Sequence, residues 1–166
     1  MAKRVVIIGA GPAGTFVANG LADSAAKGSV EVTILERKDH LDICLGQPRS
    51  MVNAAYADEA LPTYDRVLHG SKKPRVIAIA GITSVSNGEV AYTTRAGGAE
   101  AIKADAVVIA TGSTYKGKYI KNNDGVSKQE WLGRISEWRA AAAKANHIVV
   151  IGTCDGCQND GTVPFS

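Results

Sequence analysis

The sequence has 166 residues, of which 45% are hydrophobic and 21% are charged, and its formal net charge is +3. This length and apolar fraction suffice for one domain with a buried core and exclude an intrinsically disordered chain. No apolar run approaches transmembrane length, and three cysteines do not indicate a disulfide framework. The N-terminus carries no signal-peptide or presequence pattern, so we expect a cytoplasmic protein without a stable membrane anchor.

The first third of the chain predicts a βαβ unit. Residues 5–8 are a continuous run of β-branched side chains ending in glycine, which is typical of a buried parallel strand. Residues 16–26 are rich in alanine and precede Gly28, so they predict a helix with a glycine C-cap. Residues 30–35 predict the second strand. Such a crossover is almost always right-handed.

The remaining elements are predicted in chain order. Residues 37–73 are less regular, with a helix around residues 50–57. A strand over 76–80 follows, and Asn87-Gly88 predicts a hairpin between strands 82–85 and 90–94. Gly97-Gly98 marks a further turn. Residues 106–109 predict a buried strand, 131–145 a helix with Leu132, Ile135 and Trp138 on one face, and 148–151 a last strand.

The only concentrated positive charge is the run Lys72-Lys73-Pro74-Arg75. Because the net charge is small and the other basic residues are scattered, we interpret this run as a solvated loop. We therefore expect no nucleic-acid partner.

The loop after the first strand reads Gly9-Ala10-Gly11-Pro12-Ala13-Gly14. In this motif the first glycine permits a tight turn, the second lets a pyrophosphate approach the backbone, and the third lets the helix pack closely on the strand. Glu36 ends the second strand about 20 residues after Gly14, where a carboxylate can accept hydrogen bonds from ribose hydroxyls. The pattern predicts dinucleotide binding; the alternative is a retained fold that no longer holds a ligand.

A short-chain dehydrogenase with NAD(P) at the glycine loop is a weaker interpretation. That class needs a Tyr-x-x-x-Lys pair on a helix, whereas the segment from Tyr115 to Tyr119 contains a glycine and lacks this spacing.

Three segments resemble a known family. Asp105 to Ser113 resembles the A-T-G strand end of flavoproteins with two dinucleotide-binding domains. Glu36-Arg37-Lys38-Asp39 and Pro48-Arg49 resemble the apoptosis-inducing-factor-like, ferroptosis-suppressor-like NAD(P)H:quinone oxidoreductases, a subgroup of the pyridine nucleotide-disulphide oxidoreductase class. Residues 131–152 look like their hinge into an NAD(P)H-binding domain. The resemblance covers about residues 3–152.

The resemblance implies an α/β fold: a three-layer, Rossmann-like FAD/NAD(P)-binding domain with a parallel sheet, helices on one face and an antiparallel β-meander on the other. It implies that Glu36 holds the adenosine ribose with Lys38 nearby, that Arg49 lies towards the flavin, and that Ile79 offers backbone to the adenine. The residues assigned to FAD on this basis are Gly9, Gly11, Pro12, Ala13, Gly14, Glu36, Arg37, Lys38, Arg49, Ile79, Ala110, Thr111 and Gly112.

The implied reaction passes hydride from NAD(P)H to FAD and then electrons to a quinone-like acceptor. The cofactor carries this redox chemistry, so we name no catalytic acid or base.

The C-terminal segment departs from the family. A second glycine should follow Gly152 two residues later, but the chain continues as Thr153-Cys154-Asp155. We therefore expect an incomplete FAD-binding domain over residues 1–152, a tail unrelated to the family over 153–166, and no NAD(P)H site. The chain alone would then be inactive, and the alternative function is a nucleotide-binding or scaffold subunit that contacts a protein partner, or itself, through the exposed last strand.

We assign no redox or metal-binding role to the other candidate side chains. Cys154 and Cys157 have redox-pair spacing, but we favour an unselected tail. Cys44 follows the second strand, near the position at which disulphide reductases of this fold carry a redox cysteine. It has no second cysteine nearby, so we favour a buried or neutral thiol. His40, His69 and His147 are isolated, and we expect them to be exposed or fully hydrogen-bonded. Trp131 and Trp138 predict core or hinge packing. We expect no metal site.

Overall fold

The computed structural model describes residues 1–114 and 125–149. Its six strands form one sheet in the order β5-β4-β3-β2-β1-β6. The strands are β1 (Lys3–Ile8), β2 (Val30–Glu36), β3 (Arg75–Ser86), β4 (Glu89–Thr94), β5 (Ala99–Lys103) and β6 (Ala106–Ile109). The helices are α1 (Pro12–Gly20), α2 (Ala22–Ala26), α3 (Gln47–Val52), α4 (Ala54–Glu59), α5 (Tyr64–Val67) and α6 (Lys128–Ala143), with a 3₁₀ turn η1 (Cys44–Gly46).

The centre of the sheet is parallel. Strand β1 pairs with β2 on one side and β6 on the other, and β2 pairs with the first residues of β3. Side chains of β1 alternate between two cores, as the two-residue period of a strand requires. Val5 and Ile7 pack with the helical side, and Val6 and Ile8 pack with the meander. A strand buried on both faces explains the uninterrupted apolar run.

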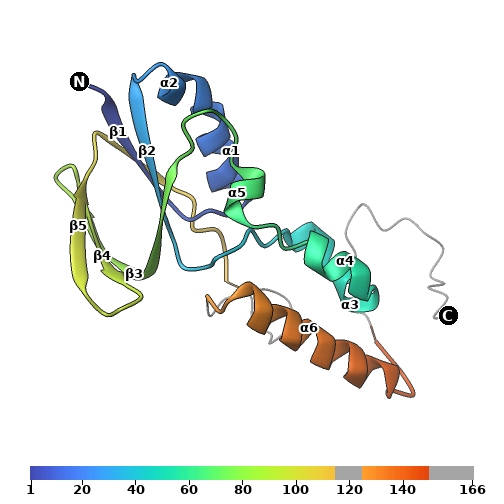
Figure 1. The fold of residues 1–166 in the computed structure, drawn as a ribbon. Coiled ribbons are helices and arrows are strands. Elements are labelled where there is room, and N and C mark those ends of the chain that lie inside the picture. The colour runs from blue at the N-terminus through green and yellow to red at the C-terminus, as the bar shows by residue number, and fades with distance from the viewer. Residues whose placement is uncertain (115–124, 150–166) are drawn as a thin grey trace.

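The meander is built from the second half of β3 with β4 and β5, which pair antiparallel. Residues 76–80 and 82–85, predicted as two strands, belong to the single strand β3. Its pairing with β4 shifts register between Ile79 and Gly81 and again between Ile82 and Ser84. Such irregularities bend a strand, and Figure 1 shows β3, β4 and β5 lying against the parallel strands. The predicted three-layer α/β fold is confirmed.

The helices differ from prediction at their boundaries. The helix predicted over residues 16–26 starts earlier, at Pro12, and is divided at Leu21 into α1 and α2. Proline is well suited to the first helical turn, which explains the earlier start. The helix predicted over 50–57 is two helices, since Asn53 ends α3 and its side chain caps α4 by accepting from the Tyr56 amide at 3.2 Å.

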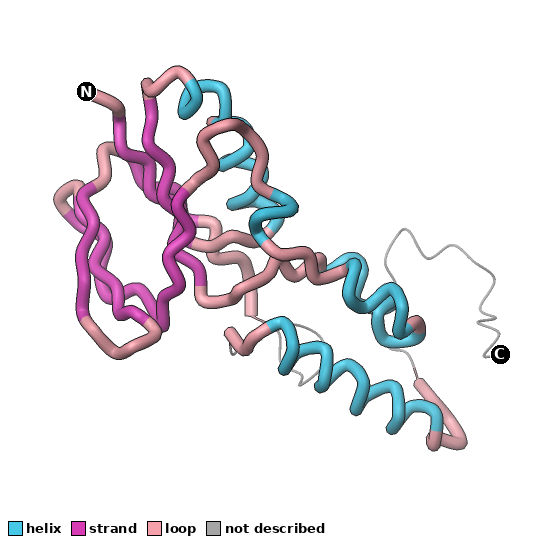
Figure 2. The backbone as a smooth tube through the Cα atoms, in the orientation of Figure 1, coloured by secondary structure: helices cyan, strands magenta, loops and turns pink. Residues whose placement is uncertain are grey.

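Helix α6 lies beside α3 and α4, away from the sheet (Figures 1 and 2). It begins at Lys128, because Ser127 accepts a hydrogen bond from the Glu130 amide, and it ends at Ala143 rather than at residue 145. Trp131 and Ile135 are its fully buried side chains and pack on Leu61. The buried face of α6 therefore differs from the predicted one. Ile135 is buried as predicted, but Leu132 and Trp138 are only half-buried.

Two further expectations differ from the structure. His40 is fully buried, and its Nε2 has no partner in the part of the chain described, so it is neither exposed nor fully hydrogen-bonded as predicted. Residues 148 and 149 are exposed and lie in no strand; the rest of the predicted last strand, the Tyr115 segment and Cys154 and Cys157 fall outside the described residues. Among the described residues, no helix has the length and apolarity needed to cross a membrane.

Candidate dinucleotide site

The glycine loop joins β1 to α1 at the carboxyl end of the parallel strands. Gly9 has φ +98°, and a Cβ there would lie 2.5 Å from the carbonyl oxygen of Ala110. A Cβ on Gly14 would lie 2.0 Å from the carbonyl oxygen of Gly9. Both glycines are thus required by the protein's own packing, Gly9 against the end of β6 and Gly14 between helix and strand, as the motif predicts.

Gly11 is different. Its backbone is extended (φ −69°, ψ −175°), and a Cβ there would meet nothing within 4 Å. Gly11 is also the N-cap of α1, where no side chain caps the helix and no acidic residue occupies the first turn. Amides in this turn lack acceptors within the helix, and its dipole favours an anion. The packing of the described residues therefore does not require a glycine at this position.

Glu36 connects the glycine loop to the segment after β2. One carboxylate oxygen accepts from the Ala10 amide at 2.6 Å, and the other accepts from the amides of Arg37 and Lys38 at 2.7 and 3.0 Å. The residue is 8% exposed. A carboxylate offers about four acceptor positions, so Glu36 retains room for one hydroxyl. Sequence reasoning assigned it to a ribose and missed its part in fixing the loop.

A cavity of about 600 Å³ opens beside this loop. It collects residues from the ends of β1, β2 and β6 and from the bend of β3, where parallel sheets of this kind bind ligands. The predicted FAD-binding residues that line it are Gly9, Gly11, Pro12, Ala13, Glu36, Arg37, Lys38, Ile79, Ala110, Thr111 and Gly112.

Two predicted residues do not line the cavity. Gly14 lies behind the loop, in the packing of α1 described above. Arg49 is exposed, and its guanidinium stacks over the Tyr56 ring at 4.4 Å from the ring centre. This stacking is a cation–π contact and links α3 to α4.

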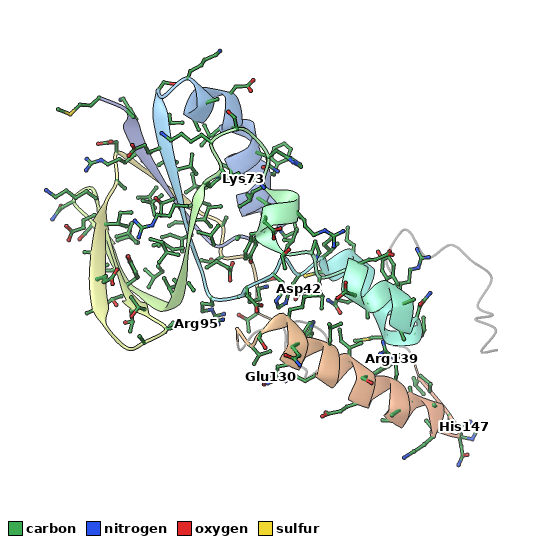
Figure 3. All side chains as sticks on the ribbon, in the orientation of Figure 1. Asp42, Lys73, Arg95, Glu130, Arg139 and His147 are labelled. Carbon is green, nitrogen blue, oxygen red and sulfur yellow. The ribbon has the colours of Figure 1, made fainter. Side chains whose placement is uncertain are left out.

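Sequence reasoning missed Asp42 and the bend residues Gly81 and Ile82, which also line the cavity. Asp42 is buried, accepts a hydrogen bond from Gln47 Nε2 at 2.6 Å, and lies 4.0 Å from Lys38 Nζ. Figure 3 shows Asp42 where the segment after β2 passes between the sheet and α6. No periodicity marks that segment, so the sequence carried no signal for it.

Cys44 also lines the cavity, and it is exposed. Of the expected buried or neutral thiol, the buried alternative is therefore wrong. Its Sγ lies 3.8 Å from the Asp42 carbonyl oxygen. Among the described residues, His, Cys, Asp and Glu form no group of three or more that could hold a metal ion.

A parallel sheet with a glycine loop, an acidic strand end and a meander that closes one side defines a dinucleotide-binding flavoprotein domain. Residues 3–154 match the family of pyridine nucleotide-disulphide oxidoreductases, and the chain belongs to that family. It is thus a domain of the flavin-dependent oxidoreductase class. No curated protein sequence matches it.

Several solved structures share this fold. NDH2 from Plasmodium falciparum in complex with NADH is 13% identical with a TM-score of 0.62, over 84% of this chain and 28% of that one. The sulfide:quinone oxidoreductase of Aquifex aeolicus is 19% identical with a TM-score of 0.60, over 86% and 33%. Reduced CoADR-RHD from Bacillus anthracis is 16% identical with a TM-score of 0.56, over 82% and 27%. The chain thus spans about a third or less of these proteins.

Proposed function

We propose that this chain is the FAD-binding portion of an NAD(P)H-dependent flavoprotein that delivers electrons to a quinone-like acceptor. The observation that carries the proposal is Gly11, which lines the cavity at the uncapped N-terminus of α1 although the packing of the described residues does not require a glycine there. A methyl group there would enter the space beside the uncapped N-terminus of α1. A pyrophosphate has the charge and size for that position.

The rest of the cavity fits FAD in composition. Glu36 has acceptor capacity for a ribose hydroxyl near the loop, and Lys38 adds a positive charge beside it. Ile79 and Ile82, from the bend of β3, line the cavity together with the end of β6. Bound FAD would supply the redox chemistry, while these residues bind and orient it.

The electron acceptor and the family subgroup are supported by fewer observations than FAD binding. Electron delivery to a quinone is supported by the printed name of the Aquifex protein and by the segments Glu36–Asp39 and Pro48-Arg49. On the same grounds we propose membership of the apoptosis-inducing-factor-like, ferroptosis-suppressor-like subgroup. The reductant NADH is supported by the complex of the Plasmodium protein.

The test is a titration of the purified chain with FAD, followed by the change in flavin absorbance and fluorescence. We expect saturable binding that Gly11→Ala weakens by about tenfold or more, because the methyl group displaces the pyrophosphate from the backbone. Gly133→Ala is the matched control, since Gly133 lies on α6 and a Cβ there also meets nothing within 4 Å.

Equal FAD affinity of the parent chain and Gly11→Ala, or no binding of FAD by either, would contradict the proposal. The second candidate is the nucleotide-binding or scaffold subunit without enzyme activity. It is favoured by a chain that takes up no FAD, because the domain would then serve protein contacts rather than electron transfer.

A further inference from the structure

A second cavity, of about 290 Å³, lies at the amino end of the parallel strands. Strand β1 leads from this cavity at Arg4 to the glycine loop at Gly9, a distance of about 16 Å at 3.3 Å per residue. The cavity is therefore a site distinct in position from the dinucleotide site.

Basic side chains from three separate segments line this cavity, which we call the basic cleft. They are Arg4 of β1, Lys72 and Lys73 of the loop before β3, Arg75 of β3 and Lys103 of β5. Glu31 is the acidic residue among those lining it. The run 72–75, interpreted from sequence as a solvated loop, is therefore one side of a larger positive surface that tertiary structure assembles.

Most of this charge is not neutralised by ion pairs between described residues. Arg4 is paired with Asp105 at 3.1 Å, and Lys73 donates to the Asp65 carbonyl oxygen at 2.6 Å. Figure 3 shows Lys73 beside α5. By contrast Lys72, Arg75 and Lys103 are exposed and form no ion pair with a described residue. Gathering these cations costs repulsion that a bound anion relieves.

Apolar residues also line the cleft. Val30, Val32, Pro74 and Ile102 line it. Strand β3 begins its pairing with β2 only at Thr33, so residues 30–32 at the start of β2 have no β3 partner beside them. The ligand that matches this surface carries negative charge next to aliphatic groups.

The chemistry favours carboxylates over a phosphate. A phosphate site such as the glycine loop gathers backbone amides at an uncapped helix end, and the residues lining the basic cleft come mainly from strands and from the loop before β3. Its cations are instead spread over three segments of the chain, with aliphatic residues among them. Such a surface suits several carboxylates spread along a chain.

We propose that the basic cleft docks an acidic segment of a partner protein in which Asp or Glu alternates with aliphatic residues. Docking of this kind is driven by charge complementarity and weakens as salt rises.

The probe is a fluorescein-labelled peptide of alternating Glu and Val, and its anisotropy is measured with the full chain at low salt. We expect saturable binding that weakens with added NaCl. Lys72→Glu should reduce the affinity by about fivefold, since it converts one exposed attraction into a repulsion. Lys144→Glu, an exposed position just after α6, changes net charge equally and should leave the affinity unchanged.

Absence of peptide binding would overturn the proposal, and so would equal loss in both variants, which would mean that only net charge matters. Vesicles of phosphatidylserine and phosphatidylcholine and a short DNA duplex are run in parallel. Binding of either, sensitive to Lys72→Glu, without peptide binding would assign the cleft to a membrane or nucleic acid and refute the acidic segment. Far-UV circular dichroism of each variant verifies the fold.

Discussion

Gly14→Ala tests whether the glycine loop is held by packing as tightly as the structure indicates. The added methyl group would lie 2.0 Å from the Gly9 carbonyl oxygen, whereas ordinary contact begins at 3.4 Å. Helix α1 must therefore move by about 1.4 Å relative to β1, in an interior that is close-packed. This movement disturbs the buried α1 residues Thr15 and Ala18.

Overpacking of this kind costs about 1–3 kcal/mol, and sometimes more. For a chain of this size each kcal/mol lowers the melting temperature by about 2–4 °C. We therefore expect Gly14→Ala to melt roughly 5 °C or more below the parent chain, measured by circular dichroism without added FAD.

Gly20→Ala is the matched control, because Gly20 ends the same helix and a Cβ there meets nothing within 4 Å. Alanine is the better helix former, by up to about 1 kcal/mol, so Gly20→Ala should melt at or above the parent temperature. An unchanged melting temperature for Gly14→Ala, or an equal loss in both variants, would refute the reasoning.

Three further predictions follow from single residues. Glu36→Gln should lower the free energy of unfolding of the FAD-free chain by about 1–3 kcal/mol, because an amide cannot accept from the Ala10, Arg37 and Lys38 N–H groups together; urea denaturation that shows no loss would contradict this. Burial lowers the pKa of His40, against the opposing hydrogen bond to Asp39. Its contribution to stability is therefore present above its ordinary pKa of 6.5 and is lost as pH falls below that value. Urea denaturation at several pH values should show the free energy of unfolding falling as pH drops below 6.5, and this fall should be smaller in His40→Gln. An equal fall in the parent chain and the variant would contradict the prediction. Finally, FAD should slow alkylation of Cys44 by iodoacetamide, followed by peptide mass spectrometry, since this thiol lines the proposed FAD cavity; an unchanged rate with FAD bound would place the ligand elsewhere.

The order of the main elements and the position of the glycine loop could be read from the sequence alone. The apolar run of β1, the spacing of Gly9, Gly11 and Gly14, and the Asn87-Gly88 turn are local signals. Each depends on the conformational preferences of a few neighbouring residues, so each can be recognised without knowledge of distant contacts.

Other features required the tertiary structure. The hydrophobic residues of the segment 37–73 follow no period. Only the pairing of residues 40–43 with residues 60–63 and the packing of the segment on α6 bring Asp42 and Cys44 to the cavity. The bend that makes 76–80 and 82–85 one strand arises from pairing with β4. Likewise Lys103 is distant in sequence from Lys72, and no local pattern predicts that the end of β5 and the start of β1 line the same cleft. Contacts between segments far apart in sequence decided these features, because their energy depends on the whole fold rather than on local preference.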